Sequence, residues 1–252
     1  MNSAICLSHE ELTAALDQRG YDCIAQDTRS FFNLTSQEDM EFFAGKENSN
    51  LVKSAGFSTE LETILSTLKK SQKKIRWIQE NGVRFIHFID GMNMLIQEVE
   101  NGEHRFSYCS HGESLRSALH GWYEFKGRKL MNEMEFLTIE LTTDSFDELH
   151  QMSPDYVEEV MKDRSTPPAF RQFLYDFTLN RKELDNFSFL FASEGKTKLE
   201  QVVFFLPSEE CVWFIDYKKV ENDQILITPF YIHEFLIQLE EKMRVFAVKQ
   251  GI

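Results

Sequence analysis

One pattern of strands and turns occurs twice in this chain of 252 residues, about 120 residues apart. Residues 83–106 contain apolar, strand-like runs separated by turn residues, and residues 202–227 repeat the arrangement. The triplet Val-Glu-Asn at 99–101 reappears at 220–222, an offset of 121. Apolar runs bounded by turn residues are typical of antiparallel strands joined by hairpins. Each copy therefore predicts a β-meander.

The helices that precede the two meanders extend the repeat. Apolar residues at 61, 64, 65 and 68 share one helical face, and those at 170, 173, 174 and 177 repeat the spacing at an offset of 109. We predict an α+β fold of two pseudo-symmetric halves, each an antiparallel β-meander flanked by helices. Residues 1–128 form the N-terminal half and residues 129–252 the C-terminal half of one compact unit. Chance similarity between alternating strands is the competing explanation.

Capping residues and turn residues predict several boundaries. Ser8 and Glu11 have capping-box spacing, which predicts a helix ended by Gly20. Ser153-Pro154 predicts a helix that begins there and runs to about residue 163. Asn81-Gly82 between apolar runs predicts a tight hairpin turn. Lysines at 69, 70, 73 and 74 are interpreted as cations at a helix C-terminus. We also predict a short helix at 36–43 and a helix from Ser110 to about residue 122.

The charge balance argues against a nucleic-acid partner. The chain has 41 acidic and 27 basic residues, a formal net charge of −14 and a pI near 5.0. Such a surface repels phosphate backbones. An acidic surface favours solubility and says little else about function.

The remaining bulk features predict a cytoplasmic protein. The N-terminus has neither the basic region nor the apolar core of a signal peptide. The longest apolar runs, such as 202–206, are far too short to span a bilayer, so we expect no membrane insertion. The four cysteines have no paired spacing, which indicates free thiols.

No motif for catalysis, a cofactor or a metal stands out. The seven histidines lack the spacing of a metal site, and Cys109 with His111 would supply only two ligands. Ser114 follows Gly112, but Arg116 stands where a nucleophile elbow needs its second glycine. Residues 195–198 lack the spacing of a phosphate-binding loop. We predict no catalytic residue, no cofactor and no metal, and therefore no enzyme.

The aromatic content points to binding instead. The chain has 23 phenylalanines, and three of them alternate along residues 187–191, so they share one face of a strand. Two lysines follow in the next hairpin. The candidate partner-binding residues are Phe187, Phe189, Phe191, Lys196 and Lys198. The alternative is that these aromatic residues only build the core. The second copy is richer in aromatic residues, so we expect it to hold the partner.

The opening helix at 7–12 (Leu-Ser-His-Glu-Glu-Leu), the helix–meander–helix order of both halves and the length resemble the EspG-like chaperones of type VII secretion systems. The resemblance implies a cytosolic bacterial chaperone or adaptor that lacks a catalytic site and binds helical secretion substrates. The chain lacks the glycine- and proline-rich composition of the best-known members. Its Lys, Asn, Phe and Ile content is typical of an AT-rich bacterium.

Two other functions stay open. An immunity protein that neutralises a bacterial toxin by direct binding would also be acidic and soluble. An enzyme of unrecognised type would need a deep pocket with converging histidine and acidic side chains. The neighbourhood of the gene would separate the first of these from a secretion chaperone.

Overall fold

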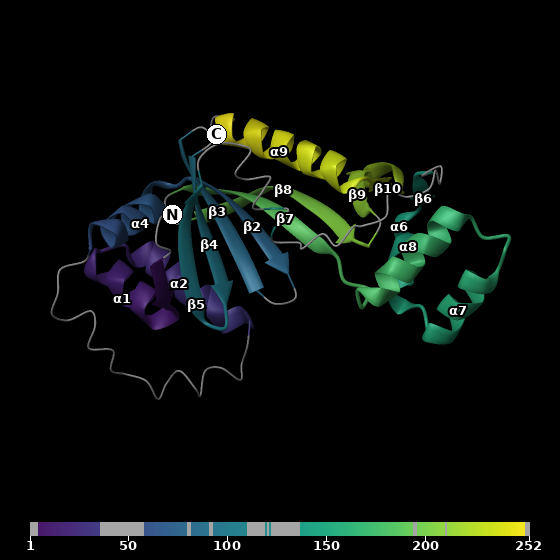
Figure 1. Ribbon diagram of the computed structural model, residues 1–252, viewed down its shortest axis with the longest axis horizontal. Coiled ribbons are helices and arrows are strands. Elements are labelled where there is room, and N and C mark those ends of the chain that lie inside the picture. Colours follow the sequence, from purple (N-terminus) through teal and green to yellow (C-terminus); the bar gives the residue numbers. More distant parts are fainter. Residues whose placement is uncertain are drawn as a thin grey trace. The chain divides into compact units, whose positions relative to one another are not determined.

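The computed structural model describes residues 5–35, 58–79, 82–90, 93–109, 119, 121, 137–193, 196–209 and 211–249 (Figure 1). The strands of these ranges form one ten-stranded sheet in the order β1-β5-β4-β3-β2-β7-β8-β9-β10-β6. Neighbouring strands within each meander pair antiparallel. The predicted α+β class is confirmed.

The two halves of the described chain have the same order of elements: an edge strand, helices, and a four-stranded meander. The edge strand of each half pairs antiparallel with the last strand of its own meander. The first half contains β1 (Ile5–Ser8), α1 (His9–Gln18), α2 (Asp22–Thr35), α4 (Thr59–Lys70), β2 (Lys73–Gln79), β3 (Gly82–Asp90), β4 (Asn93–Glu100) and β5 (Glu103–Cys109).

The second half ends in the helix α9, after its meander. It contains β6 (Ile139–Leu141), α6 (Thr143–Gln151), α7 (Pro154–Lys162), α8 (Pro168–Leu179), β7 (Asp185–Ser193), β8 (Lys196–Pro207), β9 (Val212–Lys219), the 3-10 turn η1 (Val220–Asn222), β10 (Gln224–Phe230) and α9 (Ile232–Val248). The helices α4 and α8 begin and end at residues exactly related by the predicted offset of 109.

Contacts divide the chain into two compact units. The first comprises Met1–His111, Phe189–Glu200 and Phe246–Ile252, and the second comprises Gly112–Ser188 and Gln201–Val245. Residues of β7, β8 and α9 therefore belong to both units. The predicted boundary at residues 128 and 129 lies outside the described residues, and the division into halves there stays a prediction.

The predicted helix starts are confirmed where the structure describes them. The Ser8 hydroxyl accepts from the amide of Glu11 at 3.2 Å, and the Glu11 carboxylate accepts from the amide of Ser8 at 2.9 Å. Gly20 follows α1 with a φ of 69°, which only glycine adopts at little cost. Ser153 caps α7, with proline at the first helical position. The predicted helices at 36–43 and from Ser110 lie outside the described residues, apart from two isolated positions of the latter.

The core of the first unit lies between three helices and one face of the sheet. Leu12 and Leu16 of α1 and Leu65 of α4 are buried against Leu95 of β4 and Phe106 of β5. Figure 1 shows α1, α2 and α4 together beside these strands. The apolar spacing that predicted the helices is therefore the spacing of the buried residues.

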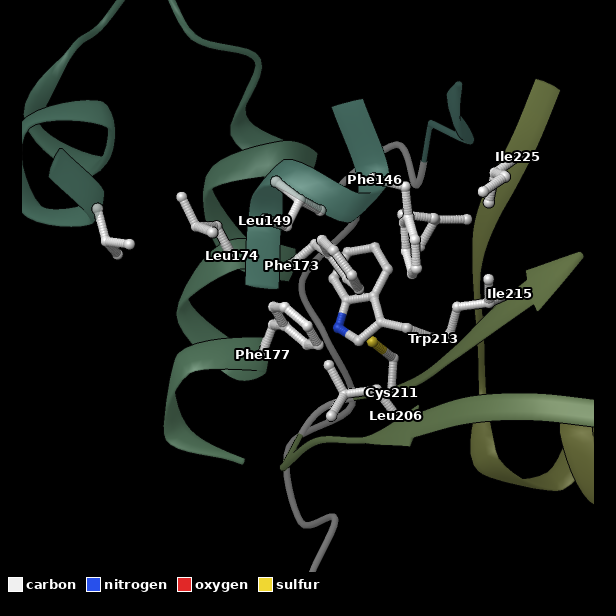
Figure 2. Close-up of a cluster of buried hydrophobic side chains, with 12 residues drawn as sticks. Phe146, Leu149, Phe173, Leu174, Phe177, Leu206, Cys211, Trp213, Ile215 and Ile225 are labelled. Atoms are coloured by element: carbon white, nitrogen blue, oxygen red, sulfur yellow. The ribbon is translucent and has the colours of Figure 1, made fainter. Parts of the chain in front are cut away.

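The core of the second unit is more aromatic, and Figure 2 shows its centre at Trp213. Phe173 of α8 meets Trp213 of β9 edge-on, with ring centroids 5.5 Å apart, and stacks on Phe177 at 5.6 Å. The indole Nε1 of Trp213 donates to the buried Asp176 carboxylate at 2.7 Å. A buried indole needs such an acceptor, so this bond fixes α8 against β9.

Two local predictions need correction. Lys73 and Lys74 belong to β2, because α4 ends at Lys70. The strands β2 and β3 pair antiparallel as the predicted hairpin requires, but Gly82 lies in their ladder opposite Gln79 and not at the centre of the turn. A Cβ at Gly82 would lie 2.6 Å from the carbonyl oxygen of Val99, so glycine is required there for the close approach of β3 to β4.

Candidate partner-binding surface

The predicted aromatic residues lie mostly inside the protein. Phe187 and Phe189 are 0% and 1% exposed. Phe187 stacks on Phe205 with centroids 5.3 Å apart, and Phe189 meets Phe246 of α9 at 5.2 Å. A partner could reach these two rings only if it displaced the protein's own elements.

The other three predicted residues are placed differently. Phe191 is half-buried, with its centroid 5.0 Å from that of Phe246 and the Lys73 Nζ 5.9 Å from its ring. Lys198 is exposed on β8. Lys196 begins β8, and its side chain is outside the described part of the structure. Partner binding at all five positions stays a prediction.

A buried polar chain crosses the sheet of the first unit. The Gln97 side chain on β4 lies between two histidines on the neighbouring strands. His87 Nε2 lies 2.9 Å from Gln97 Oε1, and Gln97 Nε2 lies 2.8 Å from His104 Nδ1. In this amide orientation His87 donates to Gln97, and Gln97 donates to His104. The imidazole of His9, from α1, stacks on His104 with centroids 5.8 Å apart.

Burial keeps these imidazoles neutral. Loss of hydration lowers the pKa of His87 to about 4, against a smaller opposing effect of its bond to Gln97. Burial likewise lowers the pKa of His104 to about 4, and the nearby His9 acts in the same direction. The pKa of His9 is also lowered by burial. The chain is therefore a neutral hydrogen-bonded network at pH 7.

Two cationic side chains lie beside this network. Lys74 and Arg76 on β2 project from the same sheet face as His87, because Lys74 pairs directly with His87. Sequence reasoning missed this group, since Lys74 was assigned to a helix end. The signal was present: lysine and arginine alternate with the apolar residues Ile75 and Trp77.

Among the described residues, no three His, Cys, Asp or Glu side chains come together as a metal site. Cys109 is buried at the end of β5, whereas His111 and Ser114 lie outside the described residues. No helix in the described ranges is long and apolar enough to cross a membrane.

The fold matches a solved structure over nearly its whole length. That structure is the Mycobacterium tuberculosis type VII secretion system chaperone EspG5 in complex with a PE25-PPE41 dimer. The alignment covers 99% of this chain and 98% of the chaperone, with a TM-score of 0.55 and 7% sequence identity. No protein-family model matches the chain, and no curated protein matches its sequence. The chain therefore shares the α+β fold of that chaperone.

Proposed function

We propose that this protein is a cytoplasmic bacterial chaperone or adaptor that binds helical substrates of a type VII secretion system. The observation that carries the proposal is the fold shared with EspG5 over 99% of the chain. The solved structure holds that chaperone with a PE25-PPE41 dimer, which is a protein partner. The action proposed for this chain is binding rather than catalysis.

The repeated order of elements supports a further part of the proposal, namely that the chain arose by internal duplication. The equal bounds of α4 and α8 at an offset of 109 agree with it. So does the pairing of each edge strand with the last strand of its own meander. We propose residues 1–128 and 129–252 as the two copies.

Co-expression tests the function directly. The chain is expressed with each small helical-hairpin protein encoded near its gene, and complexes are isolated by size-exclusion chromatography. We expect a stable complex and a higher soluble yield of the helical protein, because a chaperone shields apolar helix surface from water. Helical proteins that stay insoluble, or that elute alone, would contradict the proposal. Neutralisation of a neighbouring toxin would favour an immunity protein instead.

A matched pair of variants tests the predicted contact residues. Lys198→Glu reverses an exposed charge on β8, and Lys162→Glu reverses an exposed charge on α7. If the partner contacts β8, only Lys198→Glu should weaken the complex, since rim charges act mainly on complementary surfaces. Equal effects of the two variants would leave Lys198 outside the interface.

A further inference from the structure

Two cations, Lys74 and Arg76, are neighbours on one face of β2. Lys74 lies opposite His87, and Arg76 lies opposite Phe85, in the β2–β3 ladder. Within the described ranges neither cation forms an ion pair, and the Nε of Arg76 is buried without a hydrogen-bond acceptor. On the opposite face of β3, by contrast, Arg84 binds the carboxylate of Glu98 at 3.0 Å.

The partial burial of these two cations is expected to lower the stability of the folded protein. Lys74 and Arg76 are both half-buried. Burial lowers the pKa of Lys74, and the charge of Arg76 lowers it further. The carboxylate of Asp27 on α2 acts in the opposite direction and raises this pKa. Partly buried charges are normally paired, because an unpaired one loses hydration without compensation. Two such cations without a salt bridge to a described residue are therefore expected where a ligand supplies further negative charge.

Apolar neighbours indicate what kind of ligand fits. Further along the same face, Ile78 pairs with Val83, and Ile78 is 37% exposed. Val83 and Phe85 are half-buried. From Lys74 to Ile78 the face changes from cationic to apolar over about 14 Å, at about 3.4 Å per residue. A free phosphate would use only the cationic end, whereas a protein segment with a carboxylate beside an apolar side chain would use both ends.

We infer that this face of β2 and β3 is a docking site for an acidic, apolar helical segment of a partner protein. A carboxylate of the partner lies against Lys74 and Arg76, and an apolar side chain lies against Ile78 and Val83. The two-residue step from Arg76 to Ile78 spans about 7 Å, close to one helical turn. The partner therefore carries Asp or Glu and an apolar residue about four positions apart. Its helical form rests on the proposed function, whereas the need for a carboxylate does not.

Labelled peptides test the site on the intact protein. One capped helical peptide carries Glu and Leu four residues apart, and a second has Gln in place of each Glu. Binding is followed by fluorescence anisotropy, with inorganic phosphate as a competitor. We expect the Gln peptide to bind at least about tenfold more weakly, because it leaves the cations unpaired. Phosphate should displace the Glu peptide only weakly.

Charge-neutralising variants locate the site. Lys74→Gln combined with Arg76→Gln should weaken binding of the Glu peptide at least about tenfold. The control combines Lys70→Gln with Arg164→Gln, two exposed positions with the same change in charge, and should bind as wild type does. Circular dichroism should show a melting temperature close to that of wild type, since neither lost charge forms a salt bridge with a described residue.

Three results would overturn the inference. These are equal binding of the Glu and Gln peptides, unchanged binding by the double variant, and complete displacement by phosphate, which would indicate a small-anion site. Equal binding of a secretion substrate to wild type and to the Lys74/Arg76 double variant would contradict the docking site but agree with the proposed function. If wild type binds the Glu peptide but no secretion substrate, the result would contradict the proposed function but agree with the docking site.

Discussion

Each half attaches the first amide of a helix to a hairpin turn, but with a different chemical group. The amide of His9, at the start of α1, donates to the backbone carbonyl of Gly102 at 2.9 Å. The amide of Thr143, at the start of α6, donates to the side-chain carboxylate of Asp223 at 2.9 Å. Gly102 and Asp223 are related by the offset of 121, and both have positive φ, 79° and 56°. The position of the contact is kept although the chemistry differs.

The buried helices α4 and α8 also keep corresponding positions while the side-chain chemistry differs. Ile64 of α4 and Phe173 of α8 occupy corresponding positions, and both are buried. At the next polar position, the first half has Thr67 where the second has Asp176, the acceptor for Trp213. Aromatic packing and a buried charged bond thus stabilise the second half. The sheet of the first half contains a neutral histidine chain and two partly buried cations, Lys74 and Arg76. The docking site that we propose therefore lies in the first half, whereas the aromatic content of the sequence predicts a partner on the second half.

Truncation of one matched leucine in each half should give the largest effect and tests whether the halves are equivalent. Leu65 and Leu174 correspond at the offset of 109, and both are 0% exposed. Leu65→Ala and Leu174→Ala should each lower the free energy of unfolding by about 2–5 kcal/mol, through lost burial and a cavity. Urea denaturation measures this for each variant.

The control for these variants is Leu179→Ala, because Leu179 is 64% exposed at the end of α8. It should change the free energy of unfolding by less than about 0.5 kcal/mol. If one leucine truncation is nearly silent while the other costs several kcal/mol, the two helices do not play equivalent parts.

Acid should destabilise the first half through its histidines. The folded pKa values of His87 and His104, about 4, lie below the ordinary 6.5, so the unfolded state binds more protons between these values. The stabilising effect is complete above pH 6.5 and is lost as the pH falls toward 4. The loss is at most on the order of 3 kcal/mol per histidine. The charge of Lys74 lowers the pKa of His87, whereas at His104 the neighbouring His9 lowers the pKa and the charge of Glu10 raises it.

Urea denaturation at pH 7, 6 and 5 measures this loss. Replacing His87 and His104 together by Gln should flatten the decline between pH 6.5 and 5 relative to wild type, because glutamine does not titrate. If the free energy of unfolding falls equally with pH in wild type and variant, groups other than these two histidines cause the acid sensitivity.

Local signals in the sequence account for much of the fold. The capping box at Ser8, the proline at 154 and the apolar spacing at 61–68 each act within a few residues, and each predicted element forms. The helix α6 and the strand β1 escaped prediction because their local signals are weak. In α6 only Phe146 and Leu149 are buried, which is too few for a helical period to stand out. The strand β1 is four residues long and pairs with residues about 100 positions away, so no local pattern marks it.

Side-chain environment was less predictable than the backbone. Alternation correctly placed Phe187 and Phe189 on one face, but burial under the protein's own side chains depends on distant residues such as Phe205 and Phe246. The histidine chain follows from register alone. The two-residue turn at 101–102 pairs Val99 with His104 and so places Gln97 beside His104 on the same face.

The buried bond between Asp176 and Trp213 is expected to distinguish α8 from α4. Asp176→Ala leaves the indole N–H without this acceptor and should lower the free energy of unfolding by about 1–3 kcal/mol. Thr67→Ala, at the corresponding position of α4, should cost less, since among the described residues no such bond joins Thr67 to the sheet. Tryptophan fluorescence during urea unfolding follows both variants. A Thr67→Ala effect as large as that of Asp176→Ala would show that the bond does not set the difference.

Loss of the contact between the hairpin turn and the start of α6 should have the smallest effect on stability, and this effect should be confined to the first turn of the helix. Asp223→Ala removes the acceptor of the Thr143 amide and hydroxyl, so the first turn of α6 should open more often. Hydrogen exchange should then be faster at the Thr143 amide and unchanged at the His9 amide, whose acceptor is the backbone of Gly102. Hydrogen bonds from Thr143 hold the pKa of Asp223 below its usual range, so protonation at low pH should mimic the variant in the second half only. Equal exchange at Thr143 in wild type and variant would mean that the carboxylate merely lies beside the helix, and that only the backbone contact of the first half secures a helix end.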